Sequence, residues 1–300
     1  MAGFGWVLAT LIAAAAQTAR NATQASLTRA IGTIGATHVR FLFGLPFALV
    51  FLALVASLHG QPVPAITLKA FGFTVLGAMS QIAATALMLF LMKSQSFAVT
   101  TAWLKTEPVL VALTAAAVLG DPLSLPMLLA IATATAGVVL MSLKPGTSAA
   151  MWRDGGPALT GLLAGALFGL SAIGFRGAIV ALPTGDFLIR ATTILALGLT
   201  LQALTLGVWL LAFDRGALVA SLRAWRPSLA AGFLGAFASQ FWFIGFSLTS
   251  AANVRTLALI EVIFAQGVSR LLFRQNVSAR QVLGMAIIVL GVGLLLRSQP

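Results

Sequence analysis

Thr106–Ser142 reads TEPVLVALTAAAVLGDPLSLPMLLAIATATAGVVLMS, and Ile260–Arg297 reads IEVIFAQGVSRLLFRQNVSARQVLGMAIIVLGVGLLLR. Each stretch contains an acidic residue, an apolar run, a short polar gap and a glycine-rich apolar run, in the same order. Aligned without a gap, the stretches place Glu107 opposite Glu261 at an offset of 154 positions. This internal similarity predicts that the chain contains two repeats.

The composition is that of an integral membrane protein. Of the 300 residues, 60% are hydrophobic and only 8% are charged, whereas soluble domains contain about 25% charged residues. A helix needs about 20 apolar residues to cross the hydrocarbon core of a bilayer. Ten runs are predicted to do so: Gly3–Ala19, Thr37–Leu58, Ala70–Met92, Phe97–Leu119, Ser124–Leu143, Pro157–Leu182, Phe187–Phe213, Pro227–Ser247, Asn253–Phe273 and Arg280–Leu296.

The repeats and the ten runs together predict the architecture. The repeats cover residues 1–148 and 149–300, with five helices in each. Because five is odd, the second repeat enters the membrane from the opposite side, and the two are inverted about an axis in the membrane plane. We therefore predict an all-α polytopic membrane protein of ten transmembrane helices in two inverted five-helix repeats. In such folds the solute site lies near the midplane between the repeats.

Basic residues concentrate in the odd-numbered gaps between the predicted helices, and gaps of this kind lie in the cytoplasm. The residues counted there are Arg20, Arg29, Lys93, Lys144, Arg153, Arg215, Arg223, Arg226, Arg274 and Arg280. Both termini are accordingly predicted to lie outside. The basic residues occur singly and not as one stripe, so the net charge of +12 does not indicate nucleic-acid binding.

The fourth apolar run contains charges that a lipid-facing helix would not tolerate. Trp103–Leu110 reads WLKTEPVL, and a charged side chain at membrane depth costs ~2.5–3.5 kcal/mol. Lys105 and Glu107 point about 200° apart on a helix, so each needs a partner on another helix or in water. One interpretation is that they only lock helix packing. The interpretation we favour is that Trp103, Lys105 and Glu107 line a solute cavity.

Glu261 is the acidic group at the matching position of the second repeat. It is either a buried, protonated glutamate bonded to a neighbour or a protonatable group of the solute cavity, and we favour the second interpretation. Glu107 and Glu261 are thus candidates for coupling transport to protons. His38, near the start of the second run, is a third candidate, although a lone histidine there is more often an interfacial residue.

Other polar residues also lie inside apolar runs. Gln81 and Gln240 each follow a serine, and Trp242 is close to Gln240 and away from a helix end. We predict that these three side chains line the solute cavity. Arg40 and Arg190, each near the start of a predicted helix, either anchor helix ends or bind an anionic group.

No cofactor and no metal ion are expected. The chain has no cysteine, which excludes disulfides and cysteine-based metal sites. The glycine-rich run GLLAGALFG, from Gly161 to Gly169, is a double GxxxG pattern, which allows close helix packing and lacks the context of a nucleotide loop.

Over nearly its whole length the chain resembles the EamA-type ten-helix members of the drug/metabolite transporter superfamily. The resemblance rests on the two repeats, on Arg40 and Arg190 early in the second helix of each, and on the repeat ends, where a short gap (GDPLS, RQNVS) precedes a glycine-rich helix. Within the family the chain is similar to bacterial exporters of aromatic amino acids, which implies a multi-pass protein of the inner membrane. Those exporters have aromatic residues where Lys105 and Glu107 stand, which implies a more polar or charged solute here. Many relatives keep both termini in the cytoplasm, opposite to the orientation predicted above.

These observations predict a secondary transporter, in the direction of export, for amino acids or related small amphipathic metabolites or drugs, working by alternating access. A membrane-embedded enzyme is one alternative, and it would require a catalytic constellation such as HExxH. A channel is the other, and it would require rings of like charge or a filter loop. The expected partners are a small-molecule solute and the lipid bilayer, without nucleic acid, and ten helices suffice to enclose a site in a monomer.

Overall fold

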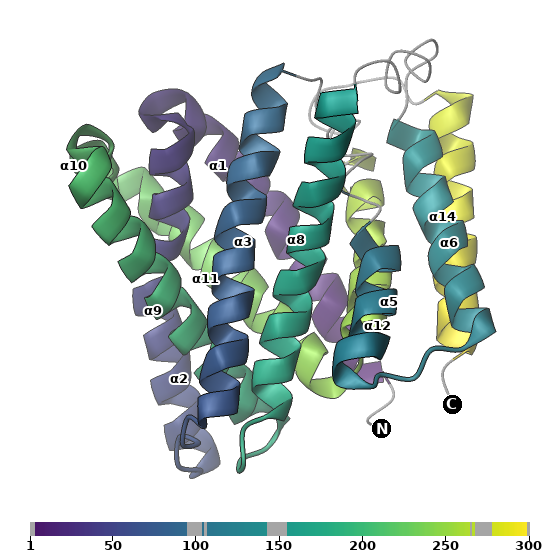
Figure 1. The fold of residues 1–300 in the computed structure, drawn as a ribbon, viewed down its shortest axis with the longest axis horizontal. Helices are drawn as coiled ribbons and strands as arrows, with labels where there is room; N and C mark the ends of the chain where they lie inside the picture. Colours follow the sequence, from purple (N-terminus) through teal and green to yellow (C-terminus); the bar gives the residue numbers. More distant parts are fainter. Residues whose placement is uncertain are drawn as a thin grey trace. The chain divides into compact units, whose positions relative to one another are not determined.

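The chain is built from α-helices. The computed structural model describes residues 4–94, 104, 107–142, 155–264, 266–267 and 278–298 (Figure 1). The elements of this part are α1 (Gly5–Leu42), α2 (Leu45–His59), α3 (Leu68–Ser94), α5 (Glu107–Leu119), α6 (Leu125–Ser142), α8 (Gly155–Val180), α9 (Phe187–Phe213), α10 (Arg215–Arg223), α11 (Trp225–Leu248), α12 (Ala251–Leu257), the 3₁₀ turn η2 (Ala258–Ile260) and α14 (Ala279–Arg297). Every regular element of the described part is helical, as the sequence predicts.

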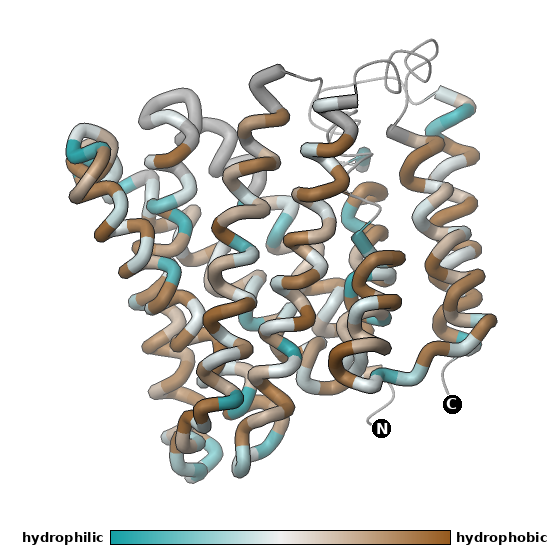
Figure 2. Tube along the Cα trace, in the orientation of Figure 1, coloured by the Kyte–Doolittle hydropathy of each residue, from teal (hydrophilic) through white to brown (hydrophobic). Residues whose placement is uncertain are grey.

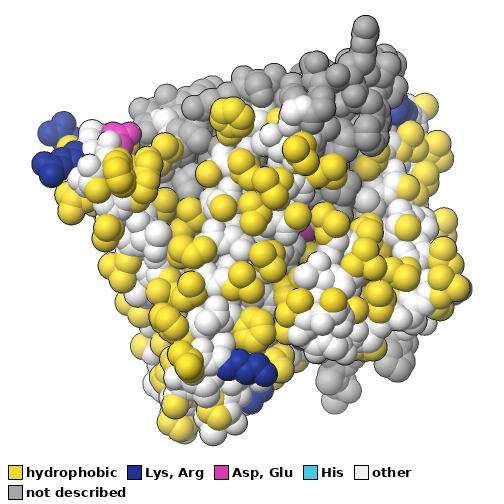
Figure 3. Space-filling view, viewed as in Figure 1, with side chains coloured by type: hydrophobic (Ala, Val, Ile, Leu, Met, Phe, Trp, Pro, Cys, Tyr) yellow, Lys and Arg dark blue, Asp and Glu magenta, His cyan; other side chains and the backbone are white. Residues whose placement is uncertain are grey.

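Six helical spans of the described part are long and apolar enough to cross a membrane. They are Thr37–His59, Leu68–Met88, Leu159–Val180, Phe187–Phe213, Ser228–Leu248 and Ala279–Arg297. Apolar residues run along most of these helices (Figure 2), and apolar side chains cover much of the face drawn in Figure 3. The protein is therefore a polytopic membrane protein. The count of ten helices and the inversion of the repeats stay predictions, because several predicted runs extend beyond the described residues.

The first helix is longer than predicted. The prediction ends it at Ala19, but α1 continues to Leu42. Residues 20–36 are too polar to count as an apolar run, yet helical hydrogen bonds are local and form with polar side chains as well. The helical conformation is interrupted at Gly32, whose φ of 73° and ψ of 175° are accessible to glycine.

Helix α10 occupies a gap that the prediction treats as a loop. Its sequence, RGALVASLR, mixes arginine with apolar residues, and Asp214 caps its start by accepting a hydrogen bond from the amide of Ala217 at 3.0 Å. Arg215 and Arg223 are exposed, and basic side chains gather at this helix in Figure 3. This pattern is typical of an amphipathic helix that lies in the membrane interface.

The chain forms two compact units, and each contains helices from both halves of the sequence. The first unit comprises Met1–Ile82 and Gly174–Thr249. In it, α1 packs along α11, and α9 packs against α2 and α11. Helices α3 and α8 approach closely, since a Cβ on Gly174 would lie 2.6 Å from the backbone nitrogen of Gly77.

The second unit comprises Ala83–Ile173 and Ser250–Pro300. In it, α6 packs along α14, and α12 packs against α5. A Cβ on Gly291 would lie 2.4 Å from the backbone nitrogen of Ala134, and a Cβ on Gly137 would lie 2.8 Å from the carbonyl oxygen of Gly284. The two helix backbones thus touch, and the contact requires glycine on both sides.

Candidate functional site

A buried ion pair joins Glu107 of α5 to Arg255 of α12 in the second unit. The Nε of Arg255 donates to Oε1 of Glu107 at 2.6 Å, and its Nη2 donates to Oε2 at 2.6 Å. The side chains of Arg255 and Glu107 are only 18% and 9% exposed, respectively. A guanidinium that binds both oxygens of a carboxylate forms a strong and directional pair. The pair also holds each charge in place, because removal of one partner would leave the other buried and uncompensated.

Local structure explains why the pair forms at this place. Glu107 lies on α5 and Arg255 on α12, and these two helices pack against each other in the second unit. The Oγ of Ser250 caps the start of α12. Gly169 of α8 gives room to α5, since a Cβ there would lie 2.9 Å from Cγ2 of Val111 and 3.8 Å from Cγ of Glu107. One glycine of the double GxxxG pattern is therefore packed beside the ion pair.

Glu261 adds a third charged group to the Glu107–Arg255 pair. Its side chain is 8% exposed, and its carboxylate acts electrostatically on Arg255. Between the two residues the helix tightens into the 3₁₀ turn Ala258–Ile260. A 3₁₀ stretch inside a helix often marks a hinge. Two carboxylates, which the repeat alignment places at matching positions, thus act on one guanidinium.

In the first unit, two glutamine side chains join α3 to α9. The Nε2 of Gln202 donates to Oε1 of Gln81 at 2.7 Å. Gln202 is 2% exposed, and a buried amide in an apolar helix requires such a partner. Sequence reasoning missed Gln202, although a lone glutamine within the apolar run Phe187–Phe213 is a usable signal.

Gln240 of α11 bonds to Thr192 of α9. Its Nε2 donates to Oγ1 of Thr192 at 2.8 Å, and the Thr192 hydroxyl donates in turn to the carbonyl of Leu188 at 2.8 Å. Because the hydroxyl proton is used in this way, Thr192 accepts from Gln240, which settles the orientation of the amide. The Oε1 of Gln240 is buried and has no hydrogen-bond partner in the described part of the chain. It is an acceptor to which a solute can donate.

Trp242 of α11 is buried against α1. Its indole Nε1 donates to Oε1 of Gln17 at 3.1 Å, and the residue is 5% exposed. The rings of Phe175 and Phe243 lie 4.7 Å apart in the same unit. The indole of Trp242 is therefore held by a hydrogen bond in an aromatic part of the first unit.

His38 is 1% exposed, and its Nδ1 lies 3.1 Å from Oγ of Ser221 on α10. The Ser221 hydroxyl donates to the carbonyl of Leu218 at 2.8 Å. Since the hydroxyl proton is used there, Nδ1 of His38 carries a proton and donates it to Ser221. This bond ties α10 to α1.

The two predicted arginine anchors have different surroundings. The guanidinium of Arg40 lies 5.0 Å from the ring centroid of Phe41. Arg190 donates to the carbonyl oxygens of Leu182 at 2.5 Å and Thr184 at 3.2 Å, both in the segment before α9. Whether either binds an anionic group stays a prediction.

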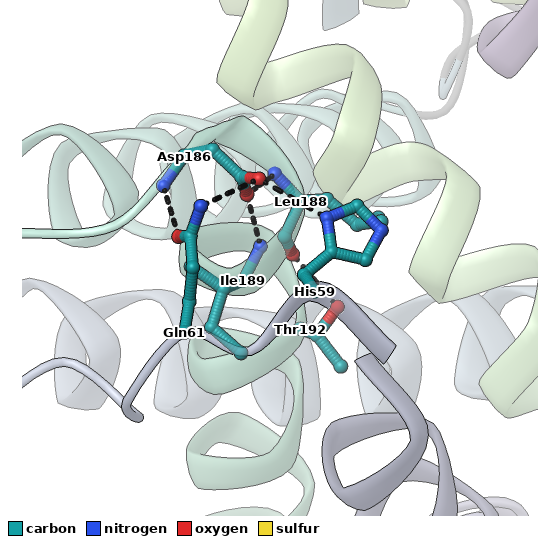
Figure 4. A network of polar contacts seen from close by, with 6 residues as sticks. All are labelled: His59, Gln61, Asp186, Leu188, Ile189 and Thr192. Carbon is teal, nitrogen blue, oxygen red and sulfur yellow. Dashed lines mark hydrogen bonds and ion pairs between the residues drawn. The ribbon is translucent and has the colours of Figure 1, made fainter. Parts of the chain in front are cut away.

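Asp186 joins two loops of the first unit, as Figure 4 shows. Its carboxylate accepts from the amides of Leu188 and Ile189 at 2.9 Å each, which caps α9. It also accepts from Nε2 of Gln61 at 3.2 Å and lies 3.3 Å from Nδ1 of His59. Partial burial raises the pKa of this carboxyl, but the backbone hydrogen bonds and His59 outweigh that effect, so the pKa of Asp186 is lowered from its ordinary value.

The predicted cavity residues divide among the parts of the structure. Trp103 and Lys105 lie outside the described residues. The others divide between the units, with Glu107 and Glu261 in the second and Gln81, Gln240 and Trp242 in the first. Their role in a solute cavity stays a prediction.

Arg255 is the functional candidate that sequence reasoning missed. It stands near the start of a predicted helix, where a basic residue usually reports membrane orientation. A usable signal was that it shares a helix with Glu261, six positions further on. Its partner Glu107 is 148 positions away, and only the tertiary structure brings the two together.

Comparison with known proteins places the chain in a family. Residues 156–297 match the EamA-like transporter family. No curated protein matched the sequence. Among 29 matching chains of solved structure, one crystal structure aligns with a TM-score of 0.68 over 98% of this chain and 96% of that chain, at 15% identity, which shows a shared fold. The matched segment, 142 of the 300 residues, supports membership of the EamA-like transporter family.

Proposed function

We propose that the protein is a secondary transporter that exports amino acids or related small amphipathic metabolites by alternating access. The family supports a membrane transporter. The solute class is argued from one observation, the Glu107–Arg255 pair with Glu261 acting on it. Charged groups kept inside a membrane protein usually serve a solute or ion path. An amino acid carries a carboxylate and an ammonium group, and this cluster provides a charge of opposite sign for each.

In this proposal Arg255 binds the carboxylate of the solute. Glu107 binds the guanidinium through two hydrogen bonds. Exchange of one carboxylate for another conserves these charge-assisted bonds, so the pair opens without leaving a bare guanidinium in a region of low dielectric. Glu107, once released, and Glu261 then attract the ammonium group of the solute.

Other side chains are assigned to the solute path on chemical grounds. The Oε1 of Gln240, which has no hydrogen-bond partner in the described part of the chain, accepts a hydrogen bond from the solute, and Gln81 and Trp242 supply an amide and an aromatic group. The proposal keeps Trp103 and Lys105 in the same role. Alternating access then follows from rocking of the two inverted repeats, which exposes the site to one side of the membrane at a time.

Proton coupling through Glu107, Glu261 or His38 is a separate part of the proposal. We expect transport by the wild-type protein to depend on pH and the Glu107→Gln/Glu261→Gln double variant to lose that dependence. The variant His38→Gln tests the histidine in the same way. If the pH profile survives in all of these variants, none of the three groups carries the coupled proton.

Counterflow of labelled amino acids in proteoliposomes tests the transporter proposal. A carrier exchanges external labelled solute for internal unlabelled solute, whereas a channel only dissipates the gradient and an enzyme converts the solute. We expect Arg255→Gln to abolish counterflow of solutes that carry a carboxylate. Arg223→Gln, at an exposed arginine of α10, is the matched control and should transport normally. A folded Arg255→Gln variant with wild-type counterflow would show that Arg255 does not bind the solute.

A further inference from the structure

A second feature of the second unit points to a different ligand. A cavity of about 470 Å³ lies along α5, α6 and the start of α14. Five aliphatic side chains of α5 and α6 line it, together with Thr135 and Arg280. The cavity therefore has an apolar wall and one positive charge, with no carboxylate among its lining residues.

Both polar residues of the cavity have a side-chain atom that lacks a partner among the described residues. Thr135 is 8% exposed, and its Oγ1 is buried and accepts or donates no hydrogen bond within that part of the chain. The Nε of Arg280 is likewise buried without a partner within the part of the chain that the structure describes. Buried polar atoms are nearly always paired in native proteins. A buried guanidinium nitrogen beside a cavity thus favours an anionic acceptor there.

The charge lies at one end of the cavity. Gly284 of α14 packs against Met141 near the end of α6, whereas Gly291 packs against Ala134, so the two helices run antiparallel. Arg280, one turn before Gly284, is accordingly near the end of α6. It is also the second residue of the membrane span Ala279–Arg297, at the depth where lipid headgroups lie.

The apolar part of the cavity continues toward the membrane interior. Its lining includes both Ala132 and Leu140 of α6, and eight residues of helix extend about 12 Å. The hydrocarbon of one leaflet is about 15 Å thick, half of the ~30 Å core. The length therefore suits much of one acyl chain that starts from a headgroup at Arg280.

This cavity is separate from the Glu107–Arg255 pair. Val109, which lines it, is two positions after Glu107 and points about 200° away from it around α5. The cavity and the ion pair therefore lie on opposite sides of α5, and neither depends on the other.

We propose that this groove binds an anionic phospholipid, with its phosphate on Arg280 and one acyl chain along α6. The apolar wall excludes a small hydrophilic solute, and the positive charge at headgroup depth selects an anionic headgroup over a zwitterionic one. A lipid bound in this way covers the junction of α5, α6 and α14 and stabilises the native second unit.

Thermal unfolding of the purified full-length protein in detergent tests the proposal. Phosphatidylglycerol and phosphatidylcholine with identical acyl chains are titrated in parallel. We expect phosphatidylglycerol to raise the melting temperature saturably and phosphatidylcholine to have a smaller effect. In Arg280→Gln the apparent affinity for phosphatidylglycerol should fall roughly tenfold or more, the loss expected for charge-assisted hydrogen bonds. Arg223→Gln removes an exposed arginine of α10 and should bind phosphatidylglycerol as the wild type does.

A second variant tests the proposed contact between the groove and the acyl chain, and this test can be used even if Arg280→Gln does not fold. Ala136 is exposed and lines the groove, so Ala136→Leu fills it without crowding the core. We expect this variant to melt like the wild type without lipid and to lose the response to phosphatidylglycerol. Inorganic phosphate alone should not stabilise the wild type. Stabilisation by phosphate alone, or an unchanged lipid response in Ala136→Leu or Arg280→Gln, would overturn the proposal.

Discussion

Removal of the Arg255 charge is the sharpest test of the buried ion pair. In Arg255→Gln the carboxylate of Glu107 loses both of its guanidinium hydrogen bonds, and Glu261 loses the positive charge on which it acts. Breaking a buried pair in this way typically costs ~3–5 kcal/mol. The side chains retain 18% and 9% exposure, so water screens part of the charge, and we expect a loss of about 3 kcal/mol in the free energy of unfolding.

Two further variants separate the effect of breaking the ion pair from the effect of replacing a side chain. In Glu107→Gln the charge of Glu261 still acts on the guanidinium of Arg255. The free energy of unfolding should therefore fall less in this variant than in Arg255→Gln. The double variant Glu107→Gln/Arg255→Gln has no unpaired charge at these positions and keeps groups that can bond to each other. Its free energy of unfolding should lie within about 1 kcal/mol of the wild-type value, since replacing a whole buried ion pair is often nearly neutral for stability.

The assay is equilibrium unfolding of the purified full-length protein in mixed micelles, with the four proteins arranged as a double-mutant cycle. A coupling energy of at least about 2 kcal/mol is expected between the two positions. If the double variant loses the sum of the two single losses, the positions are independent. The pair would then not hold α5 to α12, and the reasoning from burial would be refuted.

Three further predictions concern the units separately. Asp186→Asn keeps a side chain that can cap α9 but removes the negative charge at the start of the helix, so it should cost roughly 0.3–1 kcal/mol at pH 7. Because the pKa of Asp186 is lowered in the folded protein, its charge stabilises the fold at pH values above the unfolded pKa near 3.9. The difference in free energy of unfolding between the wild type and Asp186→Asn should therefore vanish as the pH falls through the folded pKa. Gly291→Ala places a Cβ 2.4 Å from the backbone of α6 and should cost about 1–3 kcal/mol of stability. Gly293→Ala is the control, because a Cβ there meets nothing within 4 Å, and it should be neutral or slightly stabilising. Thermal unfolding of the two variants compares these effects. Gln202→Leu removes the hydrogen bond that the buried amide of Gln202 donates to Gln81 of α3, and it should cost about 0.5–1.5 kcal/mol. Equal stability to the wild type would show that this hydrogen bond is not needed.

Some features of the fold could be predicted because they depend on local sequence. The helical class follows from runs of apolar residues long enough to cross a bilayer, and composition alone excludes a soluble fold. Helix boundaries were predicted less well. The start of α10 at Arg215 and the continuation of α1 past Ala19 both concern helices with polar or mixed faces, which a search for apolar runs does not detect.

The candidate site could be predicted only in part. The repeat offset drew attention to Glu107 and Glu261, and the cost of burying charge indicated that each needs a partner. The partner Arg255 was not singled out, because a basic residue near the start of a predicted helix is an ordinary feature of a membrane protein. Gln202 was overlooked for a related reason, since only its contact with α3 distinguishes it from a tolerated polar residue.

The amino-acid sequence by itself determined the membrane class, the helical class and the isolated polar residues inside apolar runs, because these follow from composition and short-range periodicity. The tertiary structure alone decided that Arg255 binds Glu107, that Gln240 keeps an acceptor without a partner in the described part of the chain, and that Arg280 faces an apolar groove. These pairings join residues far apart in the chain. Their free energy depends on distance and burial, and both quantities arise only when helices pack.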